Sequence, residues 1–153
     1  MKTRIYCIDH QNETLVQALV DQLDAQSSAV EFRRFPDGES YLRVTEACEG
    51  KDAVVVCSLS QPDDKILPLL FLVDTLKELG ANSVGLVAPY LCYMRQDIRF
   101  KPGEALSSRI FATLITQKFD WLVTVDPHLH RYNSLDEIYS IPSRVVSSAT
   151  AIA

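Results

Sequence analysis

Three uninterrupted apolar runs, at residues 52–58, 83–88 and 121–125, constrain the fold of this chain most. A strand with one face in water alternates polar and apolar residues, whereas a strand buried on both faces is apolar throughout. Segments with the spacing of amphipathic helices follow two of the runs, at residues 61–80 and 107–118. Alternating buried strands and helices predict an α/β fold: a parallel sheet with helices on both faces.

Flanking segments extend this pattern. Residues 4–8 are rich in β-forming side chains, and residues 13–23 carry apolar side chains at helical spacing. A last β-prone piece lies around Val145. The apolar stripe expected for the helix at residues 107–118 consists of Ile110, Phe111, Leu114 and Ile115.

A hairpin interrupts the alternation of strands and helices. Residues 30–35 and 41–44 are β-prone, and the tight turn Pro36-Asp37-Gly38-Glu39 lies between them. These residues predict two antiparallel strands that project from the main sheet.

Size and charge narrow the class of protein. The chain has 153 residues, which predicts one domain, and 47% hydrophobic residues, which argues against disorder. Its net charge of -5 argues against a nucleic-acid partner or a membrane surface. No apolar run approaches the roughly 20 residues of a membrane span, and no apolar leader segment opens the sequence.

Cysteine usage points to a reducing compartment. The four cysteines are scattered, and no CxxC pair gives them zinc-binding spacing. Cys7, Cys57 and Cys92 lie in or beside apolar runs, which predicts buried thiols. We therefore expect a soluble cytoplasmic protein.

A basic loop follows the apolar run at residues 83–88. Arg95, Arg99 and Lys101 lie within seven residues, together with Gln96 and Asp97. In parallel α/β proteins, phosphate ligands bind where such a loop leaves a buried strand and enters a helix. Arginine and lysine are the residues that bind phosphate oxygens. The alternative is an ordinary solvated loop.

Polar residues also follow the apolar run at residues 121–125. Asp126, His128 and His130 alternate along the sequence, so in an extended chain the two histidines share a face. They form either a metal site or a polar loop. Histidine suits zinc, whereas magnesium prefers oxygen and usually takes it from substrate phosphates.

Phe35, Asp37 and Glu39, at the hairpin turn, are either a recognition element or an ordinary turn. The sequence has no GxGxxG, GxxxxGK[ST] or GxSxG motif, which removes the main support for dinucleotide-binding, P-loop or α/β-hydrolase functions.

Four segments, in order, resemble the N-terminal half of ribose-phosphate diphosphokinases (PRPP synthetases). Residues 34–39 (RFPDGE) are similar to the family's R-F-x-D-G-E hairpin, and residues 89–97 (PYLCYMRQD) to its P-Y-x-x-Y-x-R-Q-D segment. Residues 101–107 are similar to its lysine-rich loop with an E-x-x-S continuation, and residues 126–128 (DPH) to its D-L-H.

The resemblance implies a type I phosphoribosyltransferase-like fold and an enzyme that transfers diphosphate from ATP to ribose 5-phosphate, giving PRPP and AMP. It implies that Arg95 and Gln96 contact ATP while Asp97 shapes their loop, with Arg99 and Lys101 as further phosphate contacts.

The resemblance also implies a homo-oligomer, because Phe35, Asp37 and Glu39 would face adenine bound to a neighbouring subunit. His128 would help to hold Mg²⁺ on the ATP phosphates, with Asp126 beside it and His130 as an additional candidate. Such chemistry needs positioning and charge neutralisation more than covalent help.

The sequence departs from the family in several places. Ile98 stands where a basic residue is common, Leu129-His130-Arg131 replaces small and polar residues, and residues 139–144 lack the family's acidic residues. These changes predict a divergent subgroup.

The acidic, glycine- and threonine-rich loop that cradles ribose 5-phosphate in the family does not occur in these 153 residues. We therefore expect residues 1–153 to be a single N-terminal domain, without the ribose-phosphate-binding domain and inactive alone. The alternatives are a non-catalytic binding or regulatory subunit and, less well supported, a phosphoribosyltransferase relative.

Overall fold

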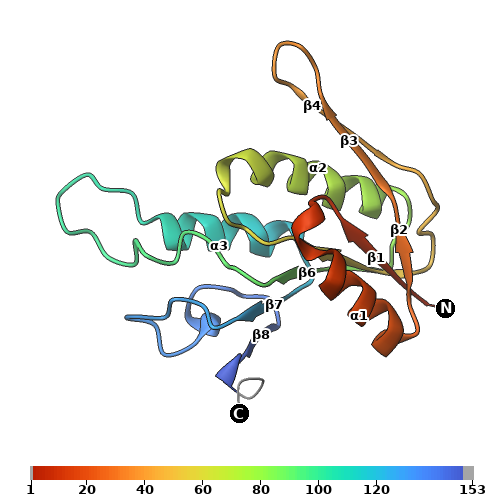
Figure 1. Cartoon of the computed structure of the whole chain (residues 1–153). Helices are drawn as coiled ribbons and strands as arrows, with labels where there is room; N and C mark the ends of the chain where they lie inside the picture. The colour runs from red at the N-terminus through yellow and green to blue at the C-terminus, as the bar shows by residue number, and fades with distance from the viewer. Residues whose placement is uncertain (1, 150–153) are drawn as a thin grey trace.

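A six-stranded sheet, parallel throughout, forms the centre of the chain in a computed structural model that describes residues 2–149 (Figure 1). The strand order is β2-β1-β5-β6-β7-β8. The strands are β1 (Thr3–Cys7), β2 (Gln26–Ser28), β5 (Asp52–Val56), β6 (Ser83–Ala88), β7 (Trp121–Val125) and β8 (Ser143–Val146). The predicted parallel sheet is thus confirmed, and its central strands coincide with the apolar runs.

Helices cover both faces of the sheet, as predicted. On one face, α1 (Glu13–Leu23) packs against a cluster that includes Ile5 and Val56. On the other, α2 (Asp63–Glu78) and α3 (Ser107–Lys118) close over a larger core that includes Leu72 and Phe111. Short 3₁₀ turns, η1 (His10–Asn12) and η2 (Leu135–Glu137), follow β1 and precede β8.

The predicted hairpin is also present. Strands β3 (Val30–Arg34) and β4 (Ser40–Val44) pair with each other in antiparallel register and form a separate two-stranded sheet. The hairpin rises past α2 and projects from the body of the molecule (Figure 1). The end of the hairpin nearest the sheet packs on the core through Val30, Leu42 and Val44. This packing anchors the hairpin, and its turn extends away from the core.

Three local predictions differ from the structure. Strand β2 was not expected, because the polar sequence Gln-Ser-Ser has no β-forming pattern. These residues form a strand because they pair with β1. Ile110, predicted to lie in the apolar stripe of α3, is 62% exposed. Cys7 is only partly buried, whereas Cys57 and Cys92 are buried as predicted.

None of the helices in the described residues is both long enough and apolar enough to cross a membrane.

Candidate functional site

Two polar segments begin at neighbouring strand ends on the carboxyl edge of the sheet. Residues 89–106 follow β6 and form a long loop that projects beyond α3 (Figure 1). Residues 126–134 follow β7, which is paired with β6. Ligands of open parallel sheets bind outside the carboxyl ends of the strands. The two segments that the sequence singled out therefore meet where a site is expected.

Arg95, Asp126 and His128 line one pocket of about 160 Å³. The remaining lining comes from Tyr90, Leu91, Met94, Val125 and Pro127. Arg95 is exposed and forms no hydrogen bond or ion pair with any residue in the described part of the chain. The pocket thus combines a free guanidinium with a carboxylate and an imidazole.

Glu104 gives the basic loop its shape. Its Oε2 accepts hydrogen bonds from the main-chain nitrogens of Phe100 (2.7 Å) and Lys101 (3.0 Å) and from Nε2 of Gln96 (3.1 Å). The two main-chain hydrogen bonds are the chief reason why the pKa of Glu104 lies below its ordinary value. The loop therefore folds around a carboxylate, and the amide of Gln96 takes part in this internal bonding.

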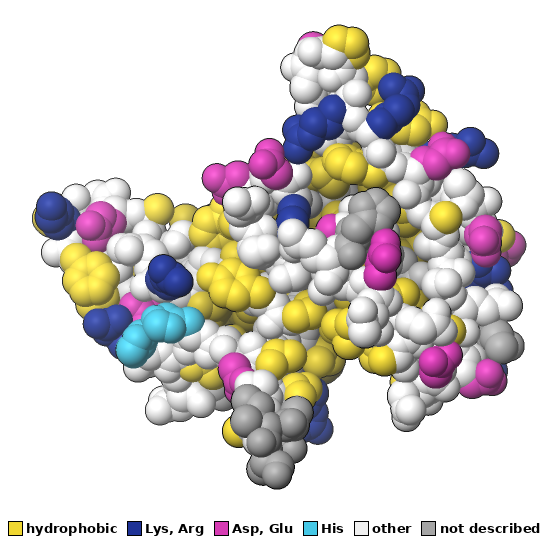
Figure 2. Space-filling view, in the orientation of Figure 1, with side chains coloured by type: hydrophobic (Ala, Val, Ile, Leu, Met, Phe, Trp, Pro, Cys, Tyr) yellow, Lys and Arg dark blue, Asp and Glu magenta, His cyan; other side chains and the backbone are white. Residues whose placement is uncertain are grey.

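Two further basic residues of the loop, Arg99 and Lys101, are exposed. Arg99 donates a hydrogen bond from Nε to the main-chain oxygen of Glu104 at 2.9 Å. Figure 2 shows histidine side chains beside lysine and arginine side chains on the lobe where this loop projects. Exposed basic side chains and histidines thus gather on this lobe.

Asp97 lies behind the loop surface rather than on it. Its side chain is 1% exposed, and its Oδ1 accepts a 2.7 Å hydrogen bond from Nη1 of Arg131. This position suits the loop-shaping role expected for Asp97.

Asp126 occupies the first position after β7 with a positive φ of 38°, a conformation that is strained for residues other than glycine. Its Oδ2 accepts hydrogen bonds from the main-chain nitrogen of Ser148 (2.9 Å) and from the Ser148 hydroxyl. The turn points the next residues away from the sheet, and strain of this kind is common at binding sites.

The rings of His128 and His130 meet edge to face with centroids 4.1 Å apart, so they share a side of the chain as expected. Both histidines are exposed. Residues 2–149 contain no group of three or more histidine, cysteine, aspartate or glutamate residues arranged to hold a metal ion. The protein alone thus offers one carboxylate and two imidazoles here.

The hairpin residues lie elsewhere. Asp37 and Glu39 line a different pocket, shared with Asp63 and Asp64 at the start of α2. Oδ1 of Asp37 accepts a 3.2 Å hydrogen bond from the nitrogen of Glu39, and Phe35 is 38% exposed. Within one chain, the structure does not bring the hairpin tip and the Arg95 pocket into one site.

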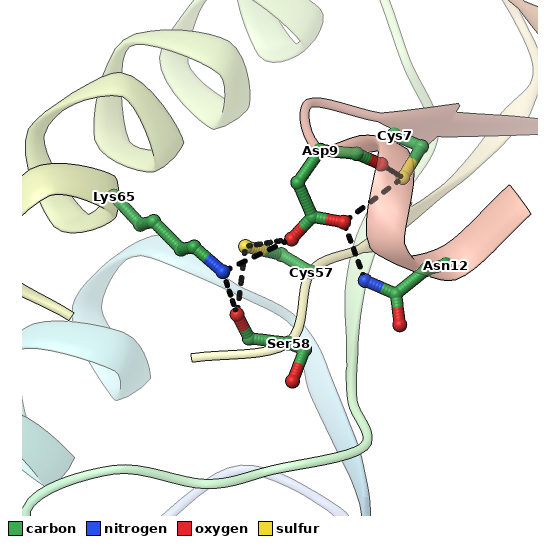
Figure 3. A network of polar contacts seen from close by, with 6 residues as sticks. All are labelled: Cys7, Asp9, Asn12, Cys57, Ser58 and Lys65. Carbon is green, nitrogen blue, oxygen red and sulfur yellow. Dashed lines mark hydrogen bonds and ion pairs between the residues drawn. The ribbon is translucent and has the colours of Figure 1, made fainter. Parts of the chain in front are cut away.

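A polar cluster at the ends of β1 and β5 was missed from the sequence (Figure 3). Oδ2 of Asp9 accepts a 3.3 Å hydrogen bond from Nζ of Lys65, and this nitrogen also donates to the main-chain oxygen of Ser58 at 2.6 Å. Oδ1 of Asp9 accepts a hydrogen bond of 2.5 Å from Nδ2 of Asn12.

Both members of the Asp9–Lys65 ion pair are largely buried, with side chains 13% and 18% exposed. Asp9 was interpreted as turn material, although its place directly after a buried-strand pattern was the available signal. Lys65 carried no signal, because a lysine in the first turn of a helix is normally solvated.

Comparison with known proteins identifies the family. Residues 5–118 match the family model for the N-terminal domain of ribose phosphate pyrophosphokinase. The chain is 41% identical over 143 residues to the ribose-phosphate pyrophosphokinase of Methanothermobacter thermautotrophicus, covering 93% of this chain and 49% of that protein. It is 40% identical over 136 residues to that of Methanopyrus kandleri, covering 88% and 45%.

A solved structure agrees with these relatives. The phosphoribosylpyrophosphate synthetase of Mycobacterium smegmatis superposes with a TM-score of 0.87 and 25% identity, covering 99% of this chain and 50% of that one. The chain spans about half the length of the relatives it matches. It therefore belongs to the ribose-phosphate pyrophosphokinase family, and its match is to the N-terminal domain of that family.

Proposed function

We propose that this chain forms the ATP-binding side of a ribose-phosphate pyrophosphokinase, which transfers diphosphate from ATP to ribose 5-phosphate and yields PRPP and AMP. One observation carries the proposal: Arg95, Asp126 and His128 converge on one pocket from two neighbouring strand ends. The reaction class comes from the relatives, which are named ribose-phosphate pyrophosphokinases.

The basic loop suits the triphosphate of ATP. Arg95 is exposed with its guanidinium unengaged by the described residues, so it is available for two parallel hydrogen bonds to phosphate oxygens. Arg99 and Lys101 add positive charge along the same loop, and Gln96 follows Arg95 directly in the sequence. Neutralising and aligning the phosphates lowers the barrier to diphosphoryl transfer without a covalent intermediate on the protein.

His128 and Asp126, with His130 as an additional candidate, would hold Mg²⁺ together with phosphate oxygens. Magnesium is commonly bound through one or two carboxylates, waters and substrate phosphates, so the Asp126 carboxylate fits this arrangement when phosphate oxygens complete the site. The described residues form no group of three or more ligands that could hold a metal ion alone, which suits a site shared with phosphate oxygens better than a cage built by the protein. When bound, the ion would neutralise charge on the transferred group.

The hairpin would serve the site of a second subunit. Phe35 offers an exposed aromatic ring, and Asp37 and Glu39 offer carboxylates that can accept hydrogen bonds from an adenine amino group. Their separation from the Arg95 pocket within one chain supports a role across a subunit contact. The active form would then be a cytoplasmic homo-oligomer.

Residues 1–153 would act as one domain, and ribose 5-phosphate would bind to a second domain. The test incubates this chain, and separately a version extended by a relative's C-terminal domain, with ATP, Mg²⁺ and ribose 5-phosphate. We expect AMP and PRPP from the extended form only. ADP as the nucleotide product, or no ATP binding by either form, would contradict the proposal. ATP binding without AMP formation would indicate a non-catalytic subunit instead.

A further inference from the structure

Arg131 and Tyr132, which follow β7, hold Asp97 and Gln96 of the basic loop. Arg131 donates from Nη1 to Oδ1 of Asp97 at 2.7 Å, and the Asp97 side chain is 1% exposed. Oδ2 of Asp97 is also buried and has no hydrogen-bond partner among the described residues. Arg131 is therefore the charged partner that compensates a buried carboxylate at the base of this loop.

Tyr132 holds Gln96, the neighbour of Asp97, through Ser108 of α3. Its hydroxyl lies 2.9 Å from Oγ of Ser108, and both residues are buried. Ser108 donates to the main-chain oxygen of Gln96 from Oγ (2.9 Å) and from its nitrogen (3.3 Å). Because the Ser108 hydroxyl has only one proton, Tyr132 is the donor to Ser108. The hydrogen bonds thus run from Tyr132 through Ser108 to Gln96.

Arg131 also contacts the outer part of the loop. Its guanidinium carbon lies 5.5 Å from the centre of the Phe100 ring, within the range of a cation–π contact. Its side chain is 47% exposed, so the guanidinium forms a bridge between a buried carboxylate and a surface ring. A planar guanidinium can hydrogen bond and stack simultaneously, which an ammonium group cannot do as well.

We propose that Arg131 is a positioning residue for nucleotide binding, which fixes Arg95 at the pocket by anchoring Asp97. This inference rests on the proposed function. Arg95 lies two residues from Asp97, and its side chain has no hydrogen bond or ion pair in the described chain, so the Asp97 ion pair and the Gln96 hydrogen bonds help to fix the main chain from which its guanidinium extends.

The test measures MgATP binding by calorimetry for the whole chain and for Arg131→Ala, Arg131→Lys and Asp97→Asn. We expect Arg131→Ala and Asp97→Asn each to weaken binding about tenfold, and the double variant to lose little more than either one, because both break the same contact. Arg131→Lys retains the charge but not the planar group that contacts both Asp97 and the Phe100 ring, so we expect it to recover only part of the lost binding. Arg144→Ala, which removes an exposed arginine of β8, is the control and should bind normally.

Two results would overturn the proposal. Additive losses in the double variant would mean that Arg131 contacts the nucleotide directly. Unchanged binding by Arg131→Ala would mean that the Arg131–Asp97 contact is not needed for nucleotide binding. Hydrogen exchange without nucleotide separates this inference from the proposed function. Arg131→Ala should speed exchange of the loop amides of Phe100 and Lys101, whereas Arg144→Ala should not. If neither the unchanged chain nor its extended form binds ATP, the proposed function fails, and exchange still decides whether Arg131 anchors the loop.

Discussion

Asp126 and Ser148 join the ends of β7 and β8. The carboxylate accepts two hydrogen bonds from Ser148, one from its hydroxyl and one of 2.9 Å from its main-chain nitrogen. These bonds favour the charged form and hold the pKa of Asp126 below its ordinary value, with the hydroxyl contributing most. A carboxylate of the proposed magnesium site is thus fixed by a residue that lies beyond the next strand.

Ser148→Ala should therefore raise the pKa of Asp126 towards the ordinary aspartate value of about 3.9. Because the folded-state pKa is lowered, this group stabilises the fold above the ordinary pKa, and that contribution disappears as pH falls through the folded pKa. The measurement is an NMR titration of the Asp126 carboxyl carbon. Ser147→Ala is the matched control and should shift it less, because Ser147 is a smaller cause of the lowering. An unchanged pKa in Ser148→Ala would show that the hydroxyl is not bonded to Asp126.

Gly85→Ala should destabilise the sheet. Gly85 is opposite Trp121 in the β6–β7 pair, and a Cβ added at Gly85 would lie 1.8 Å from Cε2 of the indole. The indole must then move, and overpacking of this kind costs about 1–3 kcal/mol. The free energy of unfolding in urea measures the loss. In a Trp121→Leu background the same glycine substitution should cost less, and an equal cost would contradict the steric explanation.

Strongly periodic and apolar segments could be predicted from the sequence. Strands β5, β6 and β7 and helix α1 were found because continuous apolar runs and helical spacing indicate which segments pack against the core. Strand β2 could not be found, because its Gln-Ser-Ser sequence acquires strand geometry only by pairing with β1. Ile110 was misassigned to the core, since periodicity does not show how far a buried face extends around a helix.

Some residues of the candidate site could likewise be selected from the sequence, and others could not. Arg95, Asp126 and His128 were selected because they follow strand ends, and the structure brings them to one pocket. The partners that hold these segments, Arg131 and Ser148, could not be assigned. Their contacts link residues far apart in the chain, and neither spacing nor residue type predicts such pairing from one sequence.

Three thiols should resist alkylation in the folded protein. Burial raises the pKa of Cys57 and of Cys92 to about 12 and that of Cys7 to about 11, so very little thiolate exists at pH 8. We expect slow reaction with iodoacetamide at pH 8 without denaturant and rapid reaction in urea, followed by mass spectrometry of the alkylated peptides. Rapid modification of Cys92 in the folded chain would contradict its burial.

Asp37→Ala should weaken nucleotide binding in an oligomer by removing a carboxylate at the hairpin tip. Asp37→Asn is the control for the fold of the turn, because its side-chain oxygen can still accept the hydrogen bond from the nitrogen of Glu39. Calorimetry with MgATP, together with sedimentation to confirm that assembly is intact, measures the effect. Normal binding by Asp37→Ala in an intact oligomer would contradict a role of the hairpin in a partner's site.

Lys65→Met should destabilise the chain by about 3 kcal/mol, because it leaves the largely buried carboxylate of Asp9 without its charged partner. The lost ammonium also donates to the main-chain oxygen of Ser58 at 2.6 Å, so the ends of β1 and β5 both lose an anchor.

Urea unfolding of Lys65→Met, Asp9→Asn and the double variant measures the coupling between the two side chains. We expect the double variant to lose clearly less than the sum of the single losses, since neutralising Asp9 removes the unpaired charge. Additive losses would show that the two groups contribute independently, and the ion pair would then have no role in joining α2 to the end of β1.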